Sequence, residues 1–184
     1  MVAKEPKTKL TYEDYAKTPE GERWELIDGV LIMAAAPNML HQNAQMDLAY
    51  PVETWVRQRG LGKVYTPDTD VCFSDTETVQ PDLVFVSNER AHILTAANIQ
   101  GAPDLVVEIL SPSTTSRDWR DKMDIYERHG VTEYWVVDPV GYFLWQFRLS
   151  DGNYALHATF GEDDTLTSPT LEGFSLPMSE VFLV

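Results

Sequence analysis

The segment from residue 102 to residue 112, APDLVVEILSP, constrains the fold more than any other part of the chain. Its apolar run is short, follows a proline and ends at Ser-Pro, which is the pattern of a strand buried on both faces of a sheet. Glu108 interrupts this run, and an unpaired carboxylate is costly in an apolar interior. We therefore expect Glu108 to meet a cation, a metal or a lysine, or to lie where the strand opens into a cleft. A structural salt bridge is the alternative.

A helix and a second apolar strand follow this segment. Residues 117–129 have a helical pattern that ends at Gly130, and residues 131–139 have the composition of another buried strand. Strand–helix–strand units in one sheet have parallel strands and a right-handed crossover. The sequence therefore predicts a parallel pair of strands at the centre of the fold.

One face of this predicted helix carries an unexpected charge. Trp119, Lys122, Met123 and Tyr126 fall within one stripe at helical spacing, so Lys122 lies on the side that faces the sheet. Lysine can extend its ammonium to solvent from such a position, and this is the conservative interpretation. The alternative is that Lys122 points at an anionic group inside the protein, for which Glu108 is the nearest candidate in sequence.

The other elements surround this unit. Asp28-Gly29 is a strong hairpin signal, because the two central positions of such a turn require positive φ, which Asp and Gly tolerate. Pro51 should kink or split the helix that contains it. The patterns predict a short helix at 11–15, a hairpin over 24–33, a helix over 39–59, strands at 64–65, 71–73 and 79–86, and a C-terminal β-meander over 142–148, 153–160 and 165–167. The fold class is α/β (α+β), with a mixed central sheet flanked by helices.

Composition limits the function classes. The 184 residues and 20.9 kDa predict a single domain over 1–184, and the net charge of −15 argues against nonspecific coating of nucleic acid, which depends on Lys and Arg. A local basic cleft is still compatible with that charge. One cysteine, Cys72, excludes an internal disulfide and fits a reducing compartment. Residues 1–9 lack the apolar core of a signal peptide, and no stretch approaches the length of a membrane span. We expect a cytoplasmic protein.

Two carboxylates and one lysine are the candidates for chemistry. Asp82 follows a proline at the predicted start of a strand, and neighbouring strands could place it beside Glu108. Such a pair can hold Mg²⁺, with Lys122 near a substrate phosphate. Asp104 competes for this role, but it lies roughly 13 Å from Glu108 along one strand, which is too far to share an ion.

At this point the sequence resembles a known family, the Uma-type restriction endonucleases of the PD-(D/E)XK nuclease superfamily. The resemblance runs in order over nearly the whole chain. Its specific part is the segment from Gly101 to Thr114, followed by Lys122 and by Gly130 to Pro139, whereas the Pro-Asp pair alone is not specific. The matching segments are 24–29, 37–41, 81–86, 101–114 and 130–139.

The resemblance implies a restriction-endonuclease-like core and a set of site residues. Asp82 and Glu108 would be the metal ligands, for Mg²⁺ or for Mn²⁺ in its place. The superfamily pattern has lysine two residues after the acidic residue, where this chain has Leu110, so the lysine would come from the following helix as Lys122. Glu25 and His41 match positions near the cleft and are carried as supporting residues.

Each supporting residue also has an ordinary interpretation. Glu25 could be a solvent-facing residue of its strand, and His41 could be a surface or helix-capping group. The resemblance further implies a nucleic-acid substrate, with DNA expected, and a homodimer by analogy with superfamily enzymes that act on duplexes.

Three functions are therefore in competition. The first is a Mg²⁺-dependent endonuclease that uses Asp82, Glu108 and Lys122. The second is a catalytically inactive nuclease-fold protein with a binding or regulatory role, which the charge of −15 favours. The third is an α/β domain in which Glu108 and Lys122 form only a buried ion pair, so that their joint replacement by apolar residues would be neutral or stabilising.

Overall fold

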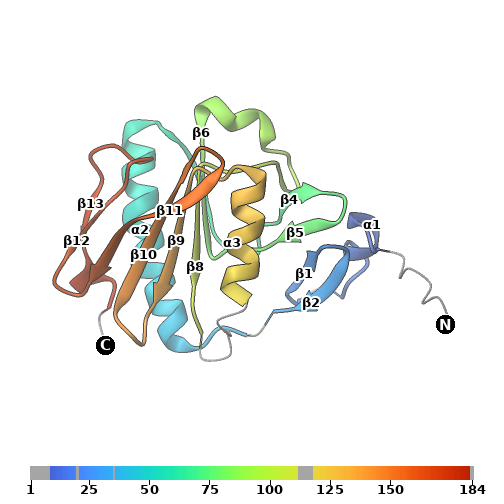
Figure 1. Cartoon of the computed structure of the whole chain (residues 1–184), viewed down its shortest axis with the longest axis horizontal. Helices are drawn as coiled ribbons and strands as arrows, with labels where there is room; N and C mark the ends of the chain where they lie inside the picture. Colours follow the sequence, from blue (N-terminus) through green and yellow to red (C-terminus); the bar gives the residue numbers. More distant parts are fainter. Residues whose placement is uncertain (1–8, 20, 35, 112–117, 183–184) are drawn as a thin grey trace.

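A mixed six-stranded sheet forms the centre of the computed structural model, which describes residues 9–182 except 20, 35 and 112–117 (Figure 1). Strands β8 and β9 run parallel, as predicted, and the other neighbouring strands are antiparallel. In spatial order the strands are β11 (Asn153–Gly161), β10 (Phe143–Ser150), β9 (Glu133–Asp138), β8 (Leu105–Ile109), β6 (Leu83–Ser87) and β3 (Gly62–Tyr65).

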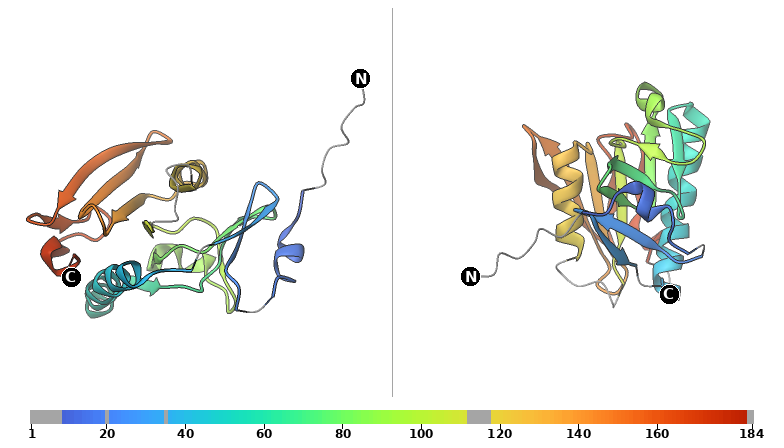
Figure 2. Two further views of the ribbon diagram at one scale, coloured as in Figure 1. Left: turned by 90° about the horizontal axis from the view of Figure 1, so that it is seen from below. Right: turned by 90° about the vertical axis from the view of Figure 1, so that its right-hand side faces the viewer.

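Two helices cover opposite faces of this sheet (Figure 2). Helix α2 (Met39–Arg59) packs Leu48 and Val52 on one face, and helix α3 (Asp118–His129) packs Ile125 on the other. Every residue of β8 is buried, which confirms the expected strand with two covered faces. Because side chains alternate along a strand, Glu108 points to the same face as Val106, which is the α3 face.

A second sheet of five strands lies beside α3 (Figure 1). The predicted hairpin supplies β1 (Trp24–Ile27) and β2 (Val30–Met33), with Asp28 and Gly29 at positive φ in the turn. Strand β1 then pairs with β5 through Leu26 and Thr78. The remaining strands of this sheet are β5 (Glu77–Val79), β4 (Val71–Ser74) and β7 (Ile99–Gln100). The hairpin is thus part of a sheet that hydropathy patterns alone did not predict.

Several other element predictions are confirmed or corrected. The short helix is present as α1 (Tyr12–Tyr15), and α3 and β9 follow the predicted boundaries closely, with residue 117 outside the described part of the chain. Pro51 does not split α2, which is one continuous helix. Two 3₁₀ helices, η1 (Asn88–Ile93) and η2 (Met178–Glu180), complete the description.

The predicted C-terminal meander is correct for two of its strands and wrong for the third. Strands β10 and β11 pair as expected, but β12 (Thr165–Thr167) leaves the main sheet. It pairs with β13 (Ser175–Pro177) in a separate two-stranded sheet. The apolar residue at the centre of β12, Leu166, is buried in the same core as α2. The position of β12 is therefore determined by the burial of Leu166, and the strand does not continue the sheet beside β11.

Glu133, at the start of β9, is fully buried and ties this C-terminal segment to the main sheet. One carboxylate oxygen accepts hydrogen bonds from Trp135 Nε1 at 2.6 Å and Gln146 Nε2 at 2.8 Å. The other accepts from Ser168 Oγ at 3.1 Å and the Thr170 backbone N–H at 2.9 Å. Neutral donors thus solvate this buried carboxylate, which satisfies its hydrogen-bonding capacity without an ion pair.

No helix in the described ranges is long and apolar enough to cross a membrane.

Candidate active site

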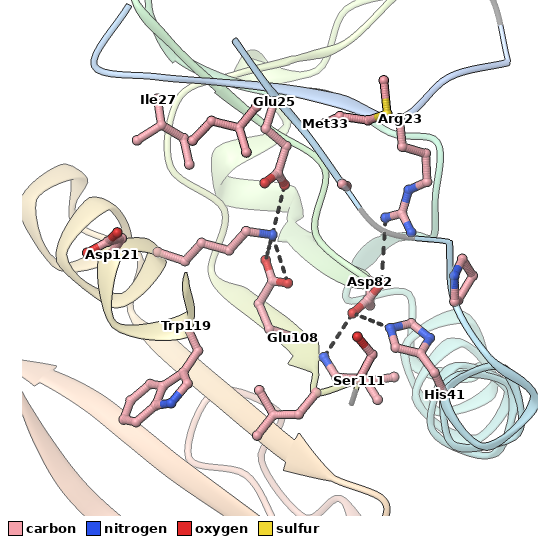
Figure 3. Close-up of a pocket in the computed structure, with 16 residues that line it drawn as sticks. Arg23, Glu25, Ile27, Met33, His41, Asp82, Glu108, Ser111, Trp119 and Asp121 are labelled. Carbon is pink, nitrogen blue, oxygen red and sulfur yellow. Dashed lines mark hydrogen bonds and ion pairs between the residues drawn. The ribbon is translucent and has the colours of Figure 1, made fainter. Parts of the chain in front are cut away.

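The predicted site residues lie around one cavity of about 240 Å³ between the hairpin, α3 and the ends of β6 and β8 in the main sheet (Figure 3). Its lining includes Glu25, His41, Asp82, Glu108 and Lys122. These side chains come from β1, α2, the residue before β6, β8 and α3, so segments distant in sequence meet here. The structure brings all the candidate residues together, and their chemical roles stay predictions.

Strand pairing explains why the two main carboxylates are neighbours. Strands β6 and β8 are antiparallel, with Leu83 opposite Val107. Asp82 precedes Leu83, and its backbone N–H donates to the Val107 carbonyl at 3.1 Å. The start of β6 therefore lies beside the end of β8, which carries Glu108.

Asp82 is buried and is held by two donors on a single oxygen. Its Oδ2 accepts the Ile109 backbone N–H at 2.8 Å and lies 3.0 Å from His41 Nε2. His41 is itself buried near the N-terminus of α2, so the surface interpretation of this histidine is wrong. The other oxygen, Oδ1, lies 3.7 Å from Arg23 Nη2. Asp82 is thus oriented with Oδ1 turned toward the cavity side that Arg23 lines (Figure 3).

Lys122 lies between two carboxylates. Its Nζ is 3.0 Å from each carboxylate oxygen of Glu108 and 2.8 Å from Glu25 Oε1. Lys122 therefore points inward, as the helical stripe indicated, and it meets Glu25 as well as Glu108. Glu25 is buried, which excludes the solvent-facing interpretation, and its Oε1 also accepts the Gln80 backbone N–H at 3.1 Å.

Burial and charge act against each other on this cluster. Burial raises the pKa of Glu108 to about 7, although the adjacent Lys122 ammonium lowers it. For Lys122, burial lowers the pKa, but the carboxylates of Glu108 and Glu25 outweigh this effect and raise it above the usual value. With its three N–H donors directed at carboxylate oxygens, the ammonium is the form that this geometry stabilises.

The competing carboxylate, Asp104, has a structural role at the other end of β8. It accepts the Ser87 backbone N–H at 2.7 Å and pairs with Arg90 Nε at 3.2 Å. These contacts attach the start of β8 to the end of β6 and to η1. Asp104 is accordingly absent from the cavity lining.

Two side chains of the site were not identified as site residues from the sequence. Tyr126 donates its hydroxyl hydrogen to Glu108 Oε1 at 2.5 Å, whereas the sequence predicts only its place on the inward stripe of α3. Arg23 lines the cavity beside Asp82. Both have a signal in hindsight: Tyr126 lies one helical turn after Lys122, and Arg23 lies two residues before Glu25, on the same side of an extended chain.

Comparison with known proteins places the chain among nuclease-like sequences and folds. A family model described as "Uma2: Putative restriction endonuclease" matches residues 11–179. Among solved structures, the chain is similar to a crystal structure from Anabaena variabilis described as a putative nuclease belonging to DUF820, with a TM-score of 0.79. The two are 20% identical, and the alignment covers 94% of this chain and 97% of that one. At this identity the likeness establishes the fold alone. No curated protein matches the chain.

Proposed function

Because the chain belongs to the Uma2 family, which is described as "Putative restriction endonuclease", we propose that it is a Mg²⁺-dependent endonuclease that hydrolyses phosphodiester bonds in DNA. One observation carries this proposal: Asp82, Glu108 and Lys122, which are far apart in sequence, line the same cavity. A buried ion pair between Glu108 and Lys122 alone would need neither Asp82 nor a cavity beside it, because pairing already offsets part of the cost of burying the two charges.

The side chains present fit a hard divalent cation. Mg²⁺ takes oxygen ligands and is commonly held by one or two carboxylates, with water and substrate phosphate completing its coordination. Asp82 and Glu108 would supply those carboxylates. No cluster of three or more His, Cys, Asp or Glu that could hold a metal occurs in the described ranges, which is compatible with a site of two protein ligands. A bound ion would supply Lewis-acid polarisation of the phosphoryl group.

The remaining residues orient these carboxylates. His41 and the Ile109 N–H hold Asp82 Oδ2, and Tyr126 and Lys122 hold Glu108, so both acids keep one position in the absence of substrate. Preorganisation of this kind lowers the reorganisation cost of phosphoryl transfer. In the proposed reaction, the oxygen of water forms a bond to phosphorus while one ester P–O bond breaks. The products are a phosphomonoester and an alcohol, with one proton of the water passing to the leaving oxygen.

The test is cleavage of plasmid DNA by purified protein with Mg²⁺ or Mn²⁺. We expect nicking or linearisation that EDTA abolishes, and a loss of about 100-fold or more in Asp82→Asn and in Glu108→Gln. Glu172→Gln, an exposed carboxylate outside the cavity, controls for the change in net charge and should cleave normally. Absence of cleavage with either metal, or undiminished cleavage by both site variants, would refute the proposal.

A specific observation favours a second candidate, a nuclease-fold protein that binds without catalysis. The net charge is −15, and the ammonium of Lys122 is already engaged by the carboxylates of Glu108 and Glu25. Titration calorimetry with Mn²⁺ separates the two functions. The enzyme is expected to bind Mn²⁺ and to lose this binding in Asp82→Asn, whereas a protein without a metal site should give no heat above dilution in either form.

A further inference from the structure

Arg23 has hydrogen-bonding capacity that its protein contacts do not use. It lies immediately before β1, lines the cavity, and directs its guanidinium at Asp82 (Figure 3). Nη2 donates to the Gln80 carbonyl at 3.3 Å, and it lies 3.7 Å from Asp82 Oδ1, beyond normal hydrogen-bond distance. Nε is buried without a hydrogen-bond partner, and Asp68 Oδ1 lies 4.0 Å from it. A guanidinium has five N–H donors, and the contact with the Gln80 carbonyl uses one of them.

A purely structural role does not account for this arrangement. Asp82 is already held through Oδ2 by the Ile109 N–H and His41, at 2.8 and 3.0 Å, so its orientation does not depend on Arg23. The exposed fraction of the Arg23 side chain is 21%, which is accessible enough for a ligand that enters the cavity. The contact with Gln80 fixes the position of the guanidinium and leaves its other edge unpaired.

Lys122, the second cation of the cavity lining, has no donors left for a ligand. Lys122 directs its ammonium at Glu108 and Glu25, over distances of 2.8 to 3.0 Å, and an ammonium has only three donors. Arg23 is therefore the cation in this lining with donors to spare. Its planar fork also matches two phosphate oxygens, a geometry that a lysine cannot offer.

We propose that Arg23 binds the non-bridging oxygens of the phosphodiester at the Asp82 end of the cavity. This inference rests on the proposed function and names the group that holds the substrate phosphate. In a chain of net charge −15, general electrostatic attraction to DNA is weak, so a positioned cation at the reacting phosphate has to supply it locally. A hydrogen bond from a guanidinium to a phosphate joins two charged groups, so it is stronger than the hydrogen bonds to water that it replaces.

The experiment measures binding and cleavage separately. Binding of a fluorescently labelled DNA duplex in Ca²⁺ is followed by anisotropy over a range of salt concentrations, and single-turnover cleavage is followed in Mg²⁺. The variants are Arg23→Ala and Arg23→Gln. Arg148→Ala, on an exposed position of β10 outside the cavity, is the control with the same change in charge.

For Arg23→Ala we expect an affinity loss of about tenfold near 0.1 M salt, because one phosphate contact contributes roughly 0.9 to the slope of log K against log salt. The magnitude of that slope should fall by about 0.9. The single-turnover cleavage rate should also fall, and added guanidinium ion should restore part of it. Arg148→Ala should match the wild type in affinity, slope and rate. A merely structural Arg23 would change stability without changing the salt slope.

The outcomes distinguish this inference from the proposed function. Wild-type affinity, slope and rate in both Arg23 variants would overturn the phosphate role of Arg23 while leaving the nuclease intact. Arg23→Gln keeps a side-chain amide that can donate to the Gln80 carbonyl, so it covers the case in which Arg23→Ala does not fold. If the wild type neither binds nor cleaves DNA, the proposed function fails, and the inference fails with it.

Discussion

Replacement of Lys122 by methionine tests the charge balance on which the candidate site depends. The substitution keeps most of the apolar stem and removes the ammonium that lies between Glu108 and Glu25. The exposed fractions of these three side chains are 16%, 10% and 7%, so solvent screens their interaction weakly. Loss of one partner from a buried ion pair costs about 3–5 kcal/mol. Because Lys122 serves two carboxylates, we expect a cost near 5 kcal/mol at alkaline pH.

The cost should depend on pH with a defined sign. The pKa of Glu108 is about 7 while Lys122 lowers it, and removal of Lys122 raises that pKa further. Above about pH 7, Glu108 is ionised in the wild type, while in the variant the folded state retains a proton that the unfolded state has lost. The folded variant then binds more protons than its unfolded state, so its stability falls as pH rises, by about 1.4 kcal/mol per pH unit. The difference between variant and wild type should therefore widen from about pH 7 to about pH 8.

A stepwise set of variants identifies the second carboxylate. If Lys122 served Glu108 alone, Lys122→Met with Glu108→Gln would restore wild-type stability. The 2.8 Å contact with Glu25 predicts only partial recovery, because Glu25 stays buried and unpaired with a cation. Adding Glu25→Gln, which keeps an acceptor for the Gln80 N–H, should recover most of the remainder.

Urea unfolding with linear extrapolation measures each step, with an unchanged m-value as the check on comparable unfolding. Lys63→Met, on an exposed position of β3, is the control and should change stability by no more than about 0.5 kcal/mol. Full recovery in the double variant would show that Glu25 is not paired with Lys122 in solution. A cost below about 1 kcal/mol for Lys122→Met alone would refute the buried cluster itself.

The remaining predictions concern the framework of the main sheet. Glu133→Gln replaces one acceptor oxygen by an amide group that donates, although all the surrounding groups are donors. The free energy of unfolding in urea should therefore fall by about 3 kcal/mol. The exposed control Glu172→Gln should be nearly neutral. Equal effects of the two changes would contradict the described hydrogen bonding. Gly62→Ala places a Cβ only 2.1 Å from the Val86 carbonyl oxygen across the β3–β6 pair, so thermal unfolding should report a loss of about 2 kcal/mol or more. Gly161→Ala is the control, because the nearest atom to a Cβ at that position is 3.6 Å away. If Gly62→Ala and Gly161→Ala had the same stability, the close approach of β3 and β6 at Gly62 would be contradicted.

The parts of the fold that could be predicted from sequence are those with a local pattern. The run in β8 is apolar on both faces because both faces are covered, and the stripe on α3 follows from its 3.6-residue period. The Asp28-Gly29 turn is local as well, since it depends on two residues that tolerate positive φ. These elements appear where the patterns placed them.

The second sheet and the place of β12 could not be predicted in the same way. Strands β4, β5 and β7 are short, and their pairing joins segments whose separation in sequence carries no periodic signal. The sequence pattern allowed β12, which contains Leu166, to continue the meander. In the structure Leu166 is instead buried in the core that packs against α2. The pairing partner of a short strand depends on which surface the rest of the chain leaves uncovered. That surface is determined by the tertiary structure and cannot be predicted from a local pattern.

The same division applies to the candidate site. The amino-acid order alone predicts Glu108 within a buried strand and Lys122 on the inward stripe of its helix, because both predictions depend only on local periodicity and the cost of burying charge. It left open whether the two side chains meet. Tertiary structure decided that Glu25 shares the same ammonium, that His41 holds Asp82, and that Arg23 retains unused donors at the cavity wall. Those contacts arise where the hairpin of one sheet meets the strand ends of another, and no local pattern specifies such a meeting.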